Sequence, residues 1–265
     1  MKTVRSLSDL EWQELLVEYD ENGKAVRYKG FPIHSYHRCA LHGEQPKEYR
    51  VDHGGNVYDV YALPVPCLKC ARIELVEQAL GDALIPKRFL GKTLESFEQK
   101  TAEQQNSFKV IKEFADTLED SLKSGRCLIL CGTPGTGKTH LACGLAREVI
   151  LAGHTAMFTT VQKLIRKVRA SWGTKEEQET LSTFIDIDLL IIDEIGVQAG
   201  SENEKSILFD IINSRYEEER STIIITNCDL NGIRHYLGER IVDRFRENKG
   251  RLIQFNGKSY RGQEL

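Results

Sequence analysis

The segment Gly132–Thr139 most constrains how this chain folds, because it has the pattern G-x-x-x-x-G-K-T. It follows a short apolar run, Arg126–Cys131, and opens a segment of helical character, Lys138–Leu151. The order therefore predicts a strand, a glycine-rich loop and a helix. In such a loop the backbone N–H groups and the helix N-terminus surround phosphate oxygens. We expect a parallel α/β domain that binds a nucleoside phosphate.

Two side chains of this loop have expected chemical roles. Lys138 is expected to reach the β- and γ-phosphates of ATP, and the Thr139 hydroxyl is expected to bind Mg²⁺. The predicted nucleotide-contacting residues are the loop and its successor: Gly132, Thr133, Pro134, Gly135, Thr136, Gly137, Lys138, Thr139 and His140. ATP and Mg²⁺ are therefore the expected ligands of this site.

Polar residues follow two further apolar runs. Leu189–Ile192 is typical of a buried parallel strand, and Asp193 and Glu194 come directly after it. Asp193 is expected to help hold Mg²⁺, and Glu194 is expected to polarise the attacking water. Asn227 follows the β-rich run 221–226, at the sheet edge where ligands bind. An adjacent Asp-Glu pair favours a nucleotide hydrolase over a simple nucleotide binder.

Helix and strand patterns alternate in the second part of the chain, which predicts a parallel sheet with helices on both faces. The expected strands are 126–131, 155–161, 189–192, 221–226 and 251–255. The expected helices are 6–19, 71–80, 101–123, 138–151, 162–172, 202–219 and 233–248, with an extended connector at 85–89. The predicted organisation is a small domain at 1–80, a linker at 81–100 and an ATPase domain at 101–265.

Composition limits the class of protein. The chain has 265 residues, of which 40% are hydrophobic and 28% charged, which fits a globular protein and argues against disorder. No apolar run approaches the roughly 18 residues of a membrane helix, and the N-terminus lacks a signal core. We expect a cytoplasmic protein with reduced thiols and no membrane partner. The net charge of −3 gives no general argument for nucleic-acid binding.

These motifs occur together in a known family. The phosphate loop, the acidic pair, Asn227, the segment 237–245 and the tail Ser259-Tyr260-Arg261 resemble DnaC-like helicase loaders. Those proteins are AAA+ ATPases related to the IstB transposition helper. The resemblance extends over residues 85–265 and is particularly close at 192–198. It implies an AAA+ fold whose helical lid is minimal or absent, because few residues follow the tail.

The resemblance also implies residue roles and partners. Arg240 matches the arginine finger that reaches the ATP of a neighbouring subunit, and Arg244, one turn later, is a second candidate. Arg261 matches the arginine that contacts the γ-phosphate within the same subunit. The implied function is ATP-dependent loading of a hexameric replicative helicase onto single-stranded DNA. The alternative is an IstB-like ATPase helper of a transposase.

A basic stretch lies in the predicted helix 162–172. From His154 to Lys175 the chain has no acidic residue, and Trp172 is close to the basic side chains. Positive charge beside an aromatic ring suits single-stranded DNA. The predicted DNA-binding residues are Lys163, Arg166, Lys167 and Arg169. The alternative interpretation is the solvated face of a core helix.

Two short metal-ligand pairs lie in the first 80 residues. The spacing favours a structural zinc site with three cysteines and one histidine: Cys39, His42, Cys67 and Cys70. His37 and His34 are alternatives to His42. A small domain with few apolar residues needs such a crosslink, and 1–80 is expected to dock the client protein, as in phage-type relatives with a similar element. A zinc-dependent DNA-binding module with a vestigial ATPase is a further alternative.

Overall fold

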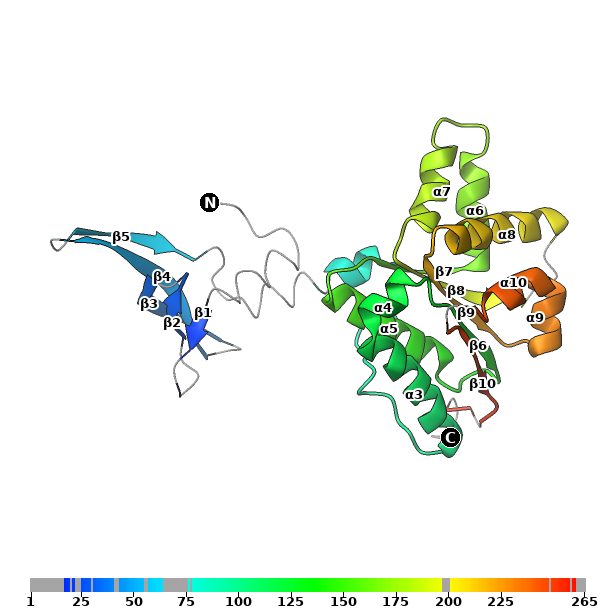
Figure 1. The fold of residues 1–265 in the computed structure, drawn as a ribbon, viewed down its shortest axis with the longest axis horizontal. Coiled ribbons are helices and arrows are strands. Elements are labelled where there is room, and N and C mark those ends of the chain that lie inside the picture. The colour runs from blue at the N-terminus through cyan, green and yellow to red at the C-terminus, as the bar shows by residue number, and fades with distance from the viewer. Residues whose placement is uncertain are drawn as a thin grey trace. The chain divides into compact units, whose positions relative to one another are not determined.

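The contacts within the chain divide it into two compact units, Met1–Ala79 and Leu80–Leu265. Figure 1 shows the fold as it stands in a computed structural model. The structure describes residues 17–19, 21, 25–29, 31–40, 43–54, 57–63, 76, 78–196, 201–247, 249–257 and 259–260. No helix within these ranges is both long enough and apolar enough to cross a membrane.

The described part of the first unit is an antiparallel sheet in which each strand pairs with the next along the chain. Its strands are β1 (Val17–Tyr19), β2 (Ala25–Tyr28), β3 (Phe31–Cys39), β4 (Gly43–Gly54) and β5 (Val57–Ala62). The predicted helix 6–19 is wrong at its end, because residues 17–19 pair with β2 as a strand. Residues 6–16 lie outside the described ranges.

The second unit is built on a five-stranded parallel sheet in the order β10-β6-β9-β8-β7. The strands are β6 (Leu128–Gly132), β7 (Ala156–Thr160), β8 (Leu189–Ile195), β9 (Ser221–Thr226) and β10 (Arg251–Phe255). The middle of each central strand is apolar and buried, as in Leu128–Leu130, Leu189–Ile192 and Ile223–Ile225, because parallel strands are covered on both faces. The predicted parallel sheet is confirmed.

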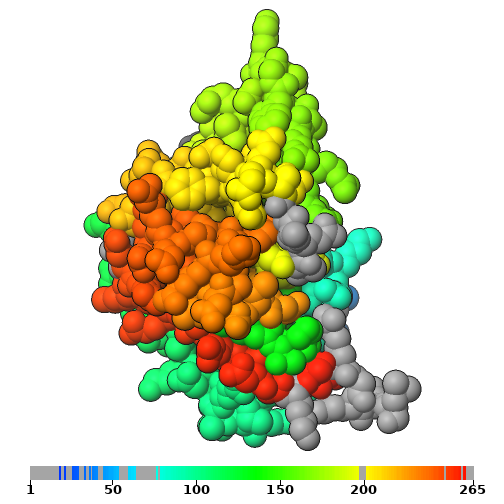
Figure 2. All heavy atoms as spheres, turned by 90° about the vertical axis from the view of Figure 1, so that its right-hand side faces the viewer, coloured from blue at the N-terminus to red at the C-terminus, as the bar shows by residue number. Residues whose placement is uncertain are grey.

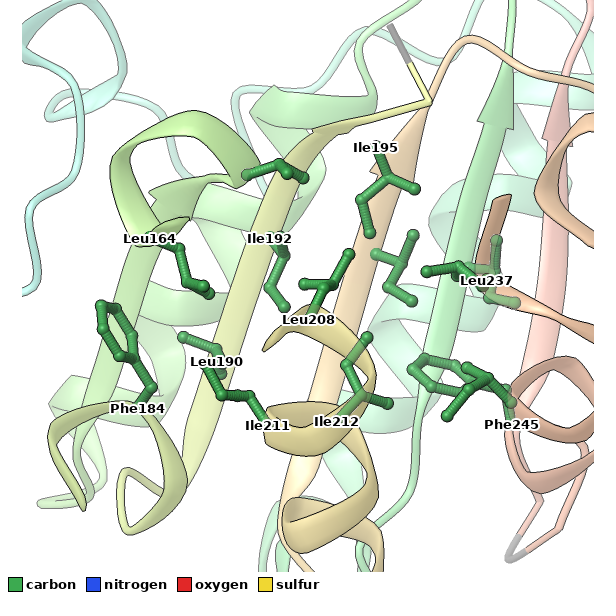
Figure 3. Packing of buried hydrophobic residues seen from close by; sticks show 14 of the residues in the cluster. Leu164, Phe184, Leu190, Ile192, Ile195, Leu208, Ile211, Ile212, Leu237 and Phe245 are labelled. Carbon is green, nitrogen blue, oxygen red and sulfur yellow. The ribbon is translucent and has the colours of Figure 1, made fainter. Parts of the chain in front are cut away.

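Helices cover both faces of this sheet (Figure 1). They are α3 (Ala102–Asp116), α4 (Leu118–Lys123), α5 (Lys138–Leu151), α6 (Val161–Ser171), α7 (Glu177–Ile185), α8 (Glu202–Glu217), α9 (Leu230–Leu237) and α10 (Glu239–Arg244). One core cluster joins α6, α7, α8, α9 and α10 to the sheet, and Figure 3 shows its packing. Because strand side chains alternate, Leu190 and Ile192 face this cluster, and the other face of the sheet contacts α5.

Several predicted elements of the second unit differ from the observed ones. The predicted helix 101–123 is interrupted at Thr117, whose hydroxyl donates to the Glu113 carbonyl. The predicted helix 233–248 is divided by Gly238, which has a positive φ of 83°. The connector 85–89 contains a 3-10 turn, η1 (Lys87–Phe89), rather than a fully extended chain. The helix α7 was not predicted from the sequence.

A buried arginine holds the base of the α6–α7 helix pair. Arg215 on α8 is fully buried. Its guanidinium donates to the carbonyls of Phe184, Ile185 and Ile187 at 2.7–2.9 Å, at the end of α7. It also donates to the Ser221 carbonyl at the start of β9. Burial lowers the pKa of the Arg215 guanidinium to about 9, so the group stays charged at neutral pH.

Candidate nucleotide-binding site

A pocket of about 760 Å³ opens at the carboxyl end of the parallel strands. This volume lies within the usual range of small-ligand sites. The pocket is lined by the phosphate loop, the end of β8, Ile225 and Asn227 at the end of β9, the segment 88–98 and Tyr260. The topology therefore brings together the loop, the acidic pair and the strand-end asparagine, as the sequence predicts for a parallel sheet.

Backbone geometry gives the phosphate loop its shape. Gly132, Gly135 and Gly137 have positive φ values of 116°, 79° and 98°, and such values strain residues that carry a Cβ. A Cβ at Gly137 would also lie 2.6 Å from the ring of Phe97. The Thr133 N–H donates to the Phe255 carbonyl at 2.7 Å, which ties the loop to β10. The loop then enters α5, whose N-terminus attracts anions.

Lys138 is buried, and its side chain folds back onto the first residues of the phosphate loop. Its Nζ donates to the carbonyls of Gly132 and Thr133, each at 2.7 Å. The ammonium group therefore lies at the inner surface of the loop, where a phosphate group bound in the loop would lie. This position suits the role expected for Lys138.

Thr139 and Asp193 are brought together from α5 and β8. The Thr139 hydroxyl donates to Asp193 Oδ2 at 3.1 Å, and Asp193 Oδ1 accepts from the Glu194 N–H at 2.7 Å. Burial raises the pKa of the Asp193 carboxyl, and hydrogen bonds from Glu194 and Thr139 oppose that shift. A hydroxyl and a carboxylate are the hard oxygen ligands that Mg²⁺ prefers, so these two residues fit the expected ion.

Glu194 and Asn227 complete the polar end of the pocket. Glu194 has a positive φ of 66°, which is uncommon for a residue with a side chain, and it is exposed to the pocket. Asn227 is also exposed and lines the same pocket. Backbone strain of this kind is frequent at functional sites, and Glu194 lies in the same pocket as the phosphate loop.

His140 contacts the preceding chain segment as well as lining the pocket. Its Nε2 lies 3.1 Å from Ser96 Oγ and 2.9 Å from the Thr93 carbonyl, and its ring meets the Phe97 ring edge-on at 5.4 Å. Burial lowers the pKa of the His140 imidazole. The imidazole therefore holds the predicted linker against the nucleotide site.

Sequence reasoning missed several pocket residues. They belong to the predicted linker and to the C-terminal segment: Arg88, Phe89, Lys92, Ser96, Phe97, Glu98 and Tyr260. Tyr260 binds the loop directly, since its N–H donates to the Gly135 carbonyl at 2.9 Å. The available signal was the number of apolar residues in the predicted linker, which include Ile85, Phe89, Leu94 and Phe97.

Two of the three predicted arginines lie outside the pocket. Arg240 and Arg244 are both on α10, and neither lines the pocket. Arg240 is exposed and forms no ion pair with another residue that the structure describes. The Arg244 guanidinium lies 4.6 Å from the centroid of the Tyr216 ring. Arg261 lies outside the described ranges.

The basic stretch occupies α6, which forms with α7 a pair of helices that projects from the sheet (Figure 1). All four basic side chains are exposed, whereas Leu164, Ile165 and Val168 are buried in the core. Arg169 is paired with Glu204 at 3.1 Å, and the Lys167 ammonium lies 5.4 Å from the Phe184 ring centroid. The other two cations, at 163 and 166, have no ion-pair partner among the described residues.

Only Cys39 of the predicted zinc ligands falls within the described ranges, and His42, Cys67 and Cys70 fall outside them. The side chains of the alternative ligands, at 34 and 37, also lie outside the description. Cys39 ends β3 and lies opposite Gly43 in the ladder with β4, so the chain reverses direction between them. Within the described part of the chain, no group of three or more His, Cys, Asp or Glu residues could hold a metal.

Comparison with known proteins gives a consistent family. A family model for the IstB-like ATP binding proteins matches residues 77–265. The replicative helicase loader DnaC of Buchnera aphidicola subsp. Schizaphis graminum is 32% identical over 189 residues, which are 70% of this chain and 76% of that protein. The replicative helicase loader DnaC of Escherichia coli K12 is 33% identical over 172 residues, 64% of this chain and 69% of that protein.

Solved structures agree with this assignment. The crystal structure of the DnaC helicase loader has a TM-score of 0.59 at 25% identity and covers 64% of this chain and 100% of that one. AMPPCP-bound DnaA from Aquifex aeolicus has a TM-score of 0.55 at 23% identity, covers 65% of this chain and 51% of that one, and shows a shared fold. The chain therefore belongs to the IstB-like ATP binding proteins and carries a DnaC-like AAA+ ATPase domain.

Proposed function

We propose that this protein is an ATP-dependent loader that places a hexameric replicative helicase onto single-stranded DNA at the start of replication. The supporting observation is that Lys138, Thr139, Asp193, Glu194 and Asn227 line one pocket in a chain that is 32–33% identical to proteins named replicative helicase loaders. The family model matches residues 77–265, which include the whole second unit, Leu80–Leu265, here called the ATPase unit, and this unit contains the pocket.

The pocket supports ATP hydrolysis through a division of roles. Lys138 and the N-terminus of α5 bind the phosphates, and Thr139 and Asp193 would hold Mg²⁺. When bound, the ion neutralises charge on the phosphate oxygens. Glu194 accepts a proton from the attacking water, and Asn227 orients that water or the γ-phosphate. Arg261 is proposed to contact the γ-phosphate within the same subunit.

Self-assembly completes the active site in this proposal. An arginine of α10 would reach the ATP of a neighbouring subunit, and both Arg240 and Arg244 are candidates. Neither residue lines the pocket of its own chain, as a residue acting on a neighbour requires. An arginine brought to the developing phosphate charge contributes a factor of about 10³ or more. ATP-bound chains would therefore hydrolyse efficiently only when assembled.

Single-stranded DNA would bind along α6. Its basic side chains are exposed on a helix that projects from the ATPase body, and Trp172 is 45% exposed at its end. Cations can follow the phosphates while an aromatic ring stacks on a base. This arrangement supports the predicted DNA-binding set, and the two cations without ion-pair partners, Lys163 and Arg166, are expected to contribute most.

The first unit would dock the client helicase and would be crosslinked by zinc. Cys39 pairs with Gly43 in the antiparallel ladder of β3 and β4, so the Cys-x2-His pair lies where two adjacent strands are joined. A closed four-ligand site has no open position for a substrate, so the metal would be structural. Loss of client binding on deletion of 1–80 is the expected result, and retained binding would count against this role.

The decisive experiment is co-elution with the replicative helicase of the same cell. Size exclusion with mass detection should be run in ATP·Mg²⁺ and then without nucleotide. We expect a stable complex whose mass gives the stoichiometry. If ATPase activity is present and neither condition yields a complex, the loader assignment is wrong.

The second candidate is an ATPase helper of a transposase, which the IstB-like family match supports. A transposase from a neighbouring genetic element would then replace the helicase as the partner in the same co-elution. Binding to the transposase and not to the helicase would favour this function. The DnaC relatives at 32–33% identity favour the loader.

A further inference from the structure

We infer that Tyr216 and Glu247 are positioning residues that hold the Arg244 guanidinium ready for the nucleotide of a neighbouring subunit. The inference rests on the proposed function, in which an arginine of α10 acts on a second copy of this chain. It adds two residues that touch neither the pocket of their own chain nor its phosphate loop.

Three elements meet at this cluster. Tyr216 lies near the end of α8, Arg244 ends α10, and Glu247 follows in the next turn of the chain. The helices α8 and α10 are in contact, and Figure 2 shows the yellow and orange segments side by side on one face of the ATPase unit. Glu247 is exposed and both Tyr216 and Arg244 are partly exposed, so a second chain can reach the cluster.

Glu247 holds the Tyr216 ring, and the ring in turn contacts the Arg244 guanidinium. The Arg244 guanidinium carbon lies 4.6 Å from the centroid of the Tyr216 ring, a cation–π contact. The Tyr216 hydroxyl donates to Glu247 Oε2 at 2.7 Å, which fixes the ring. The same hydrogen bond raises the pKa of the Tyr216 phenol. The ring thus has a fixed orientation, and the guanidinium rests on a fixed surface.

The charge of Arg244 is left available. No ion pair joins it to any residue within the described ranges, because Asp243 pairs with Arg246 at 3.3 Å and Glu247 accepts from the tyrosine. Its Nη1 is buried and has no hydrogen-bond partner. A carboxylate partner would neutralise the guanidinium, whereas an aromatic ring orients it and leaves its charge for an anionic phosphate.

Arg240 provides the contrast on the same helix. It is exposed, and neither a ring nor a carboxylate among the described residues restrains it. A long unrestrained side chain loses rotamer freedom when it binds, whereas an oriented group has already lost it. Preorganised charge is what stabilises a transition state. The geometry therefore favours Arg244 as the residue that Tyr216 and Glu247 prepare.

The test compares ATP turnover per subunit across a series of full-length variants at several protein concentrations. Arg244→Ala should lower kcat by about 10³-fold at concentrations where the protein assembles. Tyr216→Ala should lower kcat about tenfold, with the Kd for ATP unchanged. Tyr216→Phe retains the ring and should restore kcat to within about threefold of the unmodified protein. Glu247→Ala, at an exposed position, should lower kcat about threefold.

Glu218→Ala is the matched control, because Glu218 is the exposed C-cap residue of α8. It should leave kcat unchanged. Thermal melting of each variant separates misfolding from misplacement of the guanidinium, and Glu247→Ala provides the test if Tyr216→Ala does not fold.

The outcomes separate two failures. Normal turnover in Arg244→Ala would remove Arg244 from the proposed function. A defect in Arg244→Ala together with normal turnover in Tyr216→Ala and Glu247→Ala would overturn the positioning inference alone. A Tyr216→Phe variant as slow as Tyr216→Ala would also overturn it, because stacking would then not be the cause.

Discussion

The two units of this protein differ in what stabilises each of them internally. In the ATPase unit, Leu80–Leu265, the apolar middle parts of strands β6, β8 and β9 are buried between two layers of helices. In the described part of the first unit, the buried hydrophobic side chains are Tyr28, Leu63 and Val76. The ATPase unit thus has a core of its own, whereas the described residues of the first unit form an antiparallel sheet with few buried apolar side chains. A sheet with so little buried apolar surface needs a further constraint, for which zinc is our proposal.

The side chains proposed for ATP hydrolysis are positioned by the unit that has the large buried core. The phosphate loop, the acidic pair and Arg215 are all placed by the buried core of the ATPase unit. A contact made by that core should survive changes in the first unit. Removal of the proposed zinc crosslink is the most direct test of this independence.

Metal removal should give the largest effect. Structural zinc contributes about 10–16 kcal/mol of apparent binding free energy in small zinc domains. A chelator should therefore unfold the first unit, seen as loss of strand signal in circular dichroism, while the ATPase unit keeps its melting transition. Metal analysis should find one zinc per chain before chelation.

The control is Cys127→Ser, because Cys127 is buried in the ATPase unit. This variant should keep its zinc, whereas Cys67→Ser should lose it. Full zinc occupancy in Cys67→Ser, or an unchanged first unit after chelation, would contradict the crosslink.

Glu194→Gln should have the next largest effect and should leave the first unit unaffected. Loss of the base that accepts the proton of water lowers turnover by about 10²–10⁴-fold. The amide keeps the shape of the site, so the Kd for ATP should change little. Steady-state ATPase assays and nucleotide titration measure the two quantities, and parallel loss of both would point to a damaged pocket.

Arg215→Leu should destabilise the ATPase unit by at least about 3 kcal/mol. The substitution leaves several buried carbonyls without donors, and each unsatisfied group costs about 1–3 kcal/mol. Arg215→Lys keeps the charge with fewer donors and should lose about half as much. Urea unfolding measures both, and an unchanged midpoint in Arg215→Leu would show that the carbonyls find other partners.

Charge reversal on α6 should give the smallest effect. Lys163→Glu with Arg166→Glu should weaken single-stranded DNA binding about tenfold and reduce the dependence of affinity on salt. Lys167→Glu with Arg169→Glu should weaken it less, because Arg169 is paired with Glu204 and Lys167 lies over Phe184. Fluorescence anisotropy at low salt measures the affinity, and ATP binding should be unchanged in both pairs.

Equal affinity for DNA in all three proteins would remove α6 from the DNA-binding proposal. A larger loss from the second pair would show that the intramolecular contacts of Lys167 and Arg169 open when DNA binds. Both results bear on whether α6 binds DNA independently of the core against which α6 and α7 pack.

Residue pattern predicts the ATPase unit well where burial decides the structure. The parallel sheet, the helix Lys138–Leu151 and the strands 221–226 and 251–255 agree with their predicted positions. The strand-end carboxylates and Asn227 line one pocket because parallel strands end at one edge of a sheet. Local sequence and buried core point to the same structure in these segments.

Tertiary contacts decide the parts that pattern missed. The helix α7 has an almost wholly polar start, and it packs through Leu181 and Phe184 against the core. The linker looked like a passive connector, yet Phe97 covers the phosphate loop through a contact with Gly137. Such contacts join residues about 40 positions apart, and no local propensity indicates them.

The support of the phosphate loop by the C-terminal segment has a consequence during synthesis. Thr133 donates to the Phe255 carbonyl, and Gly135 accepts from Tyr260. The ribosome must therefore add about 120 residues after the loop before its supports exist, which takes about 6–25 s at bacterial rates of ~5–20 residues per second. Throughout this interval a nascent chain carries the nucleotide motif without its buttress. Truncated chains that end before Phe255 should consequently neither compete for ATP nor enter the assemblies of full-length chains.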